Sequence, residues 1–206
     1  MSVLTFKGGI HPYEGKELSK DGEITEYYPI GDVAISMSQH IGAPAKPIVN
    51  IGEKVLVGQL IGESGGFISA NVHSSVSGVV KAIEPRLLVN GGKATCIIIE
   101  NDGKFEEITF TKPKSLDELS KEEIINLVKN AGVVGMGGAG FPTNVKLSPK
   151  EPDKIDFVIV NGSECEPYLT SDYRRMIENP EMLVSGLKVM LKVFDKAKGI
   201  IAVEDN

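Results

Sequence analysis

The sequence predicts a two-part chain in which a small all-β unit precedes an α/β unit with parallel strands. In residues 30 to 100, short runs rich in Val and Ile alternate with Gly, Pro and Asn, which is typical of closely spaced strands and turns. Beyond residue 115 the pattern becomes helical, and two continuous apolar runs, Ile155 to Val160 and Gly199 to Val203, are separated by helical sequence. A strand, helices and a second strand in this order indicate a parallel crossover unit.

Length, charge and composition exclude several classes of protein. The chain has 206 residues, a hydrophobic fraction of 41% and a formal net charge of −6, which fits a globular protein. Its basic residues are dispersed, so it lacks the cationic stripe that nucleic-acid binding needs, and no apolar run approaches the roughly 20 residues that cross a bilayer. Because Met1 to Phe6 lack a signal-peptide pattern, we expect a cytoplasmic protein with no direct membrane span.

The cysteines and histidines predict no metal site within the chain. Cys96 and Cys165 form no C-x-x-C pair, which fits a reducing compartment and excludes a self-contained iron–sulfur or structural zinc site. Cys165 lies between two glutamates that disfavour its thiolate, so it is not a candidate nucleophile. The histidines, His11, His40 and His73, have no ligand spacing, and we expect structural or surface roles for them.

The all-β part has a pattern of its own. The runs "GEKVLVGQLIGE" and "HSSVSGVVKAI" resemble the biotinyl/lipoyl sandwich, a barrel-sandwich hybrid in which two hairpin halves flank a turn with a modified lysine. The corresponding span, Ser64 to Asn71, has no lysine, so we expect a scaffold or docking domain and not a carrier arm. We place this domain at residues 1–105, a linker at 106–120 and an incomplete α/β nucleotide-binding domain at 121–206.

Helices are predicted on both sides of the first apolar run of the second part. In "SKEEIINLVKNAG", Ser120 and Glu123 have the spacing of a capping box, and Gly132 is a helix stop. Farther on, "TSDYRRMIENPEMLVSGLKVMLKVF" predicts two helices that separate near Asn179–Pro180.

The run "GMGGAGFPTNVKL", residues 135 to 147, carries the main functional signal. It fits G-x-G-x-x-G literally, but a helix precedes it and Pro142 follows it, so the context of a Rossmann turn is missing. It is no P-loop either, because Phe141 stands where the lysine should be. A Gly-rich linker without a ligand is the alternative, although the apolar flanks and the helix-opening stretch Thr143–Lys146 differ from a linker.

Such bare backbone suits the close approach of an anion. Successive N–H groups without side chains form an anion-binding nest, and Lys146, six residues after Gly140, can bring a positive charge to the same place. In an acidic protein, this local cradle predicts a phosphate site.

A second group of polar residues, in "VNGSECEPYLTSD", begins where the first apolar strand ends. Ligands of open α/β sheets sit beyond the carboxyl ends of strands, so Asn161, Ser163, Glu164 and Glu166 emerge at a favoured place. The Asn161 amide both donates and accepts hydrogen bonds, which suits the edge of a flavin or nicotinamide ring. A polar turn that only caps the strand is the alternative.

The segments "GMGGAGFPTNVKL" and "VNGSECEPYLTSDYR" resemble the RnfC family, whose members are subunits of the Rnf ion-translocating ferredoxin:NAD oxidoreductase. They are more distantly similar to the NADH-binding flavoprotein subunit of respiratory complex I. "FKGGIHP", "QHIGAP" and "HSSVSG" match RnfC in particular, so the likeness covers nearly the whole chain. The resemblance implies a site for FMN and NADH.

By position, the resemblance also implies roles for individual residues. Lys146 would pair with the flavin phosphate, Phe141 would pack on a nucleotide ring, and Asn161 and Glu164 would face the flavin ring system. Ser163 departs from the aspartate that is common in the complex I relative. The residues implied to line the phosphate are Gly135, Gly137, Gly138, Ala139 and Gly140.

The function implied by the resemblance is that of an oxidoreductase subunit in a membrane-associated, ion-translocating complex. It would pass electrons between NAD(H) and iron–sulfur centres through FMN, with no side chain acting as acid, base or nucleophile. Relatives carry C-x-x-C-x-x-C-x-x-x-C ligands for two [4Fe–4S] clusters beyond the part matched here, so we expect this chain to hold half of the flavin site and to be inactive alone.

The implied partners are NAD(H) and other Rnf-type membrane subunits, which would hold the protein on the inner face of the cell membrane. Two alternatives stay open. One is a soluble NADH-dependent electron-transfer partner of a reductase, and the other is a non-catalytic docking module.

Overall fold

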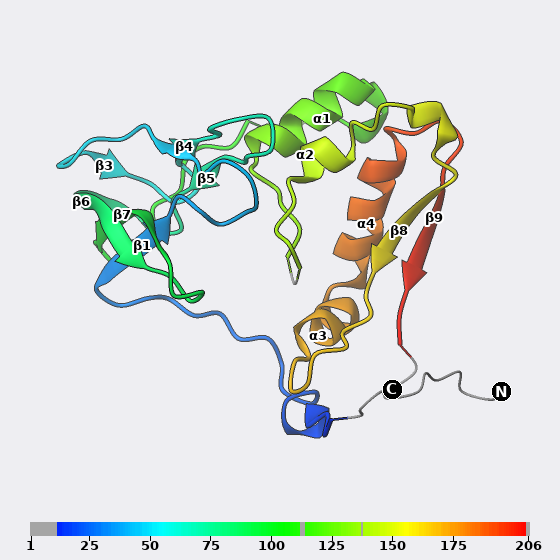
Figure 1. The fold of residues 1–206 in the computed structure, drawn as a ribbon, viewed down its shortest axis with the longest axis horizontal. Coiled ribbons are helices and arrows are strands. Elements are labelled where there is room, and N and C mark those ends of the chain that lie inside the picture. Colours follow the sequence, from blue (N-terminus) through cyan, green and yellow to red (C-terminus); the bar gives the residue numbers. More distant parts are fainter. Residues whose placement is uncertain (1–11, 112–113, 137, 205–206) are drawn as a thin grey trace. The chain divides into compact units, whose positions relative to one another are not determined.

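The computed structural model describes residues 12–111, 114–136 and 138–204 (Figure 1). The chain divides into two compact units, which are described separately: a larger unit, Tyr27–Lys154, and a smaller unit formed by Met1–Glu26 and Ile155–Asn206. The two units are defined by contacts within the chain and do not test the predicted domain boundaries. The boundaries at residues 105 and 120 therefore stay a prediction. His11, Gly137 and the start of the chain lie outside the described residues.

The larger unit contains two antiparallel sheets, which together we call the β sandwich. One sheet has the strand order β1-β7-β6-β3 and the other the order β2-β4-β5. The strands are β1 (Asp32–Ser36), β2 (Lys46–Pro47), β3 (Lys54–Val55), β4 (Leu60–Glu63), β5 (Val72–His73), β6 (Gly78–Leu87) and β7 (Lys93–Asn101).

Both sheets contribute to a single hydrophobic core. Alternation along β7 places Ile97 and Ile99 in this core at 0% exposure, together with Ile61 of β4, which is equally buried. Each such side chain contributes about 1.5–3 kcal/mol through its removal from water. The core residues are Ile35, Met37, Ala45, Val49, Val55, Ile61, Val72, Val76, Val80, Ile97 and Ile99. This arrangement confirms the predicted barrel-sandwich fold.

Part of the predicted linker pairs with the β sandwich. The Val57 N–H donates to the Glu106 carbonyl (2.9 Å), and the Ile108 N–H donates to the Val57 carbonyl (3.0 Å). The connection from β7 therefore returns across the sandwich before the chain turns helical.

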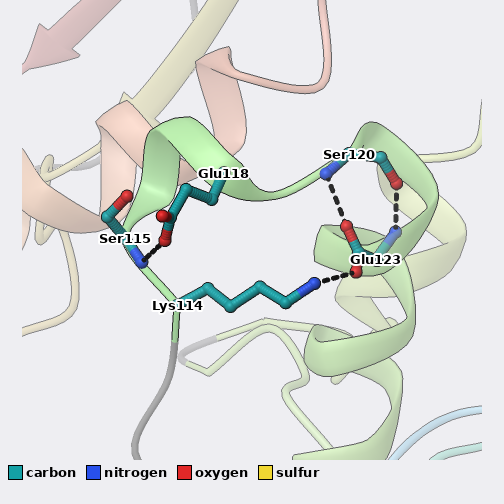
Figure 2. Close-up of polar contacts among 5 residues, drawn as sticks. All are labelled: Lys114, Ser115, Glu118, Ser120 and Glu123. Carbon is teal, nitrogen blue, oxygen red and sulfur yellow. Dashed lines mark hydrogen bonds and ion pairs between the residues drawn. The ribbon is translucent and has the colours of Figure 1, made fainter.

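Capping boxes define the start of the helical region (Figure 2). The 3-10 helix η2 (Leu116–Glu118) begins with a box between Ser115 and Glu118, and helix α1 (Lys121–Asn130) begins with the predicted box between Ser120 and Glu123. Lys114 also binds Glu123, with its ammonium 3.0 Å from the carboxylate. Short helix α2 (Thr143–Lys146) and 3-10 helix η3 (Pro152–Lys154) complete the larger unit.

The smaller unit is a parallel crossover. Strands β8 (Phe157–Asn161) and β9 (Lys198–Ala202) pair in parallel, and helices α3 (Ser171–Glu178) and α4 (Pro180–Leu191) lie between them in sequence. Figure 1 shows β8 and β9 as neighbouring arrows with α4 alongside. A Cβ at Gly199 would lie 2.9 Å from the side chains of Leu187 and Leu191, so glycine permits this close packing of helix and sheet. The predicted parallel α/β unit is confirmed.

Candidate functional site

The glycine run forms a narrow hairpin, defined here as residues 133–143. Its two arms meet at an antiparallel bridge between Val134 and Pro142. The Gly135 N–H donates to the Phe141 carbonyl (2.9 Å), and the Thr143 N–H donates to the Val133 carbonyl (2.9 Å). The described residues on either side of position 137 therefore form the two paired arms of a hairpin between α1 and α2 (Figure 1).

The tip of this glycine hairpin contains backbone N–H groups without hydrogen-bond partners among the described residues. Among the described residues, no hydrogen bond engages the N–H groups of Gly138, Ala139 or Gly140. No heavy atom would lie within 4 Å of a Cβ at Gly138, whereas Gly140 has a φ of 63°, in the left-handed region that favours glycine. The Gly135 N–H, in contrast, is not available to a ligand, because it already donates to the Phe141 carbonyl. Of the amides predicted to bind phosphate, those at 138–140 are available, and Gly137 lies outside the described residues.

Lys146 brings a positive charge to the base of the hairpin. Its ammonium nitrogen lies 2.9 Å from the point that a Cβ on Gly135 would occupy, and the Phe141 nitrogen lies 3.6 Å from that point. The absence of a side chain at Gly135 therefore makes room for the ammonium. The Lys146 side chain is exposed, and no carboxylate pairs with it among the residues that the structure describes.

The loop after β8 carries the second predicted group of residues. Exposed Asn161 folds its side chain onto this loop, because its Oδ1 accepts the Ser163 N–H at 3.1 Å. Glu164 is buried, with 7% of its surface exposed. Its carboxylate accepts the Ser171 hydroxyl (2.9 Å) and the N–H groups of Asp172 (3.1 Å) and Tyr173 (3.3 Å).

Glu164 therefore caps the N-terminus of α3 from a distance in the sequence. The N-cap residue itself, Thr170, makes no side-chain capping bond, and the carboxylate satisfies N–H groups that the first helical turn leaves without partners. Burial by itself would raise the pKa of Glu164, but the hydrogen bonds from Asp172, Ser171 and Tyr173, with the charge of Lys16, hold that pKa below its ordinary value. Glu164 is thus held as a carboxylate.

The N-terminal segment of the smaller unit packs against this loop. The Lys16 ammonium donates to the carbonyls of Glu164 and Leu169, the latter at 3.2 Å. The Tyr168 N–H donates to the Glu14 carbonyl at 2.6 Å, and Tyr168 has a positive φ of 67°. No local feature of the sequence indicates these contacts, because about 150 residues separate the partners in the chain.

A cavity of about 450 Å³ opens beside these contacts, at the carboxyl ends of β8 and β9. Its volume is in the range of small-molecule sites. Carboxylates, ammonium groups and apolar side chains all contribute to its wall. The lining residues are Glu14, Lys16, Glu17, Lys20, Gly162, Glu164, Thr170, Tyr173, Met176, Ile177, Val203 and Glu204. The predicted favoured position at the strand ends thus coincides with a concave surface.

The predicted site residues fall into two groups. Those of the glycine hairpin, including Phe141 and Lys146, lie together in the larger unit, whereas Asn161 and Glu164 lie together in the smaller unit. The union of the two groups in one site stays a prediction. Within the described residues, no group of three or more His, Cys, Asp or Glu side chains could hold a metal ion, and no helix is long and apolar enough to span a bilayer.

Two family models match parts of this chain. Residues 4–104 match the family model described as "RnfC Barrel sandwich hybrid domain", and residues 128–206 match that described as "Nuo51 FMN-binding domain". The chain belongs to the RnfC family. The RnfC barrel model covers the β sandwich, and the FMN-binding model covers both groups of predicted site residues.

Curated relatives of this RnfC-family chain are subunits of oxidoreductase complexes. It is 44% identical over 206 residues to a subunit of the proton-translocating ferredoxin:NAD(+) oxidoreductase complex of Clostridium ljungdahlii, and the match covers 99% of this chain and 45% of the relative. It is 45% identical over 203 residues to the counterpart in the Na(+)-translocating complex of Acetobacterium woodii, covering 98% and 46%. It is 37% identical over 208 residues to a subunit of the ion-translocating oxidoreductase complex of Rhodobacter capsulatus, covering 100% and 40%. The chain thus spans less than half the length of these relatives.

Proposed function

We propose that this chain supplies the flavin-phosphate half of an FMN site in an electron-transfer subunit of a membrane-associated, ion-translocating oxidoreductase. Electrons would pass between NAD(H) and iron–sulfur centres outside this chain, which has two cysteines in all. The observation that carries the proposal is a single hairpin that has N–H groups without partners among the described residues at its tip and the Lys146 ammonium at its base, beside Gly135. The match of residues 128–206 to an FMN-binding family supports it.

The residues present suit a phosphate group. The N–H groups of Gly138, Ala139 and Gly140 can donate to phosphate oxygens, and the open space around Gly138 leaves room for an anion there. Lys146 lies beside the same hairpin and offers a point charge without a competing carboxylate among the described residues. We therefore assign phosphate binding to these four residues, with Gly137 retained as a predicted member.

The remaining assignments concern the ring system. We propose that Phe141 packs on a nucleotide ring and that the Asn161 side chain, whose Oδ1 is held by Ser163, presents its NH₂ group to a ring edge. Glu164 contributes differently from a free carboxylate, because its oxygens are bound to the start of α3. Its role in the site is to fix the loop that displays Asn161.

Bound FMN would supply the chemistry, since a flavin accepts a hydride from NADH and releases its electrons one at a time. The chain's own residues would bind and orient the cofactor. No acid, base or nucleophile is needed, and the Glu164 carboxylate, held ionised by its hydrogen bonds, does not act as one. We further propose NAD(H) and other subunits of an Rnf-type complex as partners, and a position on the inner face of the cell membrane through those subunits.

Titration of the chain with FMN, and separately with riboflavin, tests the proposal. Riboflavin lacks the phosphate, so FMN should bind more tightly. A hydrogen bond to a charged group contributes about 1.5–3 kcal/mol, and Lys146→Ala should therefore weaken FMN binding by about 10- to 100-fold without affecting riboflavin. Lys150→Ala, which removes an exposed charge four residues farther along, is the matched control. Equal affinities for FMN and riboflavin, or unchanged FMN binding by Lys146→Ala, would refute a phosphate site and favour a docking role.

A further inference from the structure

The segment Gln39–Ile41 of the β sandwich lies directly against the glycine hairpin. The Ile41 N–H donates to the Gly140 carbonyl at 3.3 Å. A Cβ at Gly140 would lie 3.2 Å from the His40 Cα and 3.4 Å from the Gln39 carbonyl oxygen, so the two backbones are in close contact. The contact joins the part of the chain matched to the RnfC barrel with the part matched to the FMN-binding family.

The His40 ring holds this segment in place. Its Nδ1 lies 3.0 Å from the Ile41 carbonyl oxygen, and its Nε2 accepts the Ala70 N–H at 3.1 Å. With Nε2 as acceptor, the ring proton is on Nδ1, which donates to Ile41, and Nε2 also lies 3.2 Å from the Ala70 carbonyl oxygen. Ala70 is buried, with 3% exposed, so the ring fixes Ile41 to an ordered part of the sandwich.

The turn Ser64–Asn71 supports the other end of the hairpin. The Asn71 side-chain amide donates to the Asn130 carbonyl at the end of α1 (3.3 Å). Immediately after α1, Gly132 has a φ of 66°, and a Cβ there would collide with the Asn71 carbonyl oxygen. The turn at which a carrier domain displays its lysine is here packed against the helix that leads into the hairpin.

We propose that the β sandwich positions the glycine hairpin, and that His40 is the positioning residue for its outgoing arm. His40 acts through Ile41 and Gly140 and touches no ligand in this proposal. The consequence for FMN affinity rests on the proposed function, whereas the positioning of the hairpin does not. The sandwich is then a structural part of the nucleotide site and not a separate docking module.

Three variants of the 206-residue chain test the proposal. His40→Ala removes all three ring contacts, the one to Ile41 and the two to Ala70. In His40→Gln, the side-chain oxygen can still accept the Ala70 N–H, so this variant should keep much of the positioning of the hairpin that His40→Ala loses. Ser77→Ala is the matched control, because Ser77, like His40, joins two segments of the sandwich. Its hydroxyl donates to Asp102 (2.7 Å) and accepts the Glu106 N–H (3.0 Å), and it does not contact the described residues of the hairpin.

The first readout is amide hydrogen exchange at Ile41 and across residues 133–143, which needs no ligand. We expect His40→Ala to raise exchange there by about 10-fold, the equivalent of one lost hydrogen bond, with a smaller rise in His40→Gln and none in Ser77→Ala. The second is FMN affinity, which should fall in the same order. Thermal unfolding of all three variants shows how much general destabilisation accompanies each change.

The outcomes separate this inference from the proposed function. If exchange at the hairpin rises only in the His40 variants but the wild-type chain does not discriminate FMN from riboflavin, positioning holds and the phosphate site fails. If exchange at Ile41 and the hairpin is the same in His40→Ala and Ser77→Ala, His40 does not position the hairpin, and this conclusion holds whether or not the chain binds FMN. Should His40→Ala not fold, Asn71→Ala provides the second test, and unchanged exchange at residues 130–134 in that variant would overturn the proposal.

Discussion

Removal of the Glu164 carboxylate should loosen the start of α3. In Glu164→Ala, the Ser171 hydroxyl and the N–H groups of Asp172 and Tyr173 lose their acceptor. Loss of a helix cap costs about 0.5–2 kcal/mol, and hydrogen bonds to a charged group are worth about 1.5–3 kcal/mol. We therefore expect this helix to lose about 2 kcal/mol of stability, which corresponds to an equilibrium constant for local opening that is about 30-fold larger.

Amide hydrogen exchange at Asp172 and Tyr173 measures this opening directly. The pKa of Glu164 is lowered from its ordinary 4.5, so its stabilisation is complete above that value and is lost as the pH falls through the folded-state pKa. The ratio of exchange rates between variant and wild type should thus be constant near neutral pH and shrink in strong acid. Glu166→Ala, which removes an exposed neighbouring carboxylate, should have no such effect. Equal ratios for the two variants, or a ratio independent of pH, would show that Glu164 is not the cap.

Three further predictions follow from local geometry. Ser120→Ala removes one half of the capping box of α1 and should lower the free energy of unfolding by about 1 kcal/mol in urea titrations. Gly132→Ala combines a φ of 66° with a collision against the Asn71 carbonyl oxygen, and should cost more than about 2 kcal/mol in the same assay. Thiol-labelling reagents should modify exposed Cys165 in the native protein and reach buried Cys96 only after unfolding.

Each of these predictions has an outcome that contradicts it. For Ser120→Ala, unchanged stability would mean that the box contributes nothing to α1. Gly91→Ala is the control for Gly132→Ala, since Gly91 has a φ of 80° but open space around it. An equal loss of stability in both variants would show that the collision with Asn71 contributes nothing. Labelling of Cys96 as fast as Cys165 in the native state would contradict its burial at 2% exposure.

Features of the fold that depend on neighbouring residues could be predicted from the sequence. The capping box of Ser120 and Glu123 is set by a spacing of three residues. Helix α1 ends at Asn130, two residues before Gly132, whose left-handed φ is typical of a helix stop. The parallel pairing of β8 and β9 followed from two apolar runs separated by helices. In all these cases the physical cause lies within one segment of the chain, or in the order of segments.

The contacts of the candidate site could be predicted only in part. The sequence singled out the glycine run and Lys146, but it did not predict a hairpin, because the pairing of the Gly135 N–H with Phe141 depends on how the two arms meet. The burial of the Glu164 carboxylate against α3 likewise depends on tertiary packing, as does the hydrogen bond from Lys16 to the Glu164 backbone carbonyl. The three histidines have no ligand spacing, and the sequence signal for His40 was its place in "QHIGAP", a segment that resembles the RnfC family.

The most direct test of the phosphate cradle is the response of individual amides to FMN. In a ¹⁵N-resolved NMR titration of the chain, the signals of Gly138, Ala139 and Gly140 should shift with FMN and stay in place with riboflavin, because the phosphate is their proposed partner. Movement of these signals by both ligands alike, or shifts confined to other parts of the chain, would contradict the central claim that the hairpin and Lys146 bind a flavin phosphate.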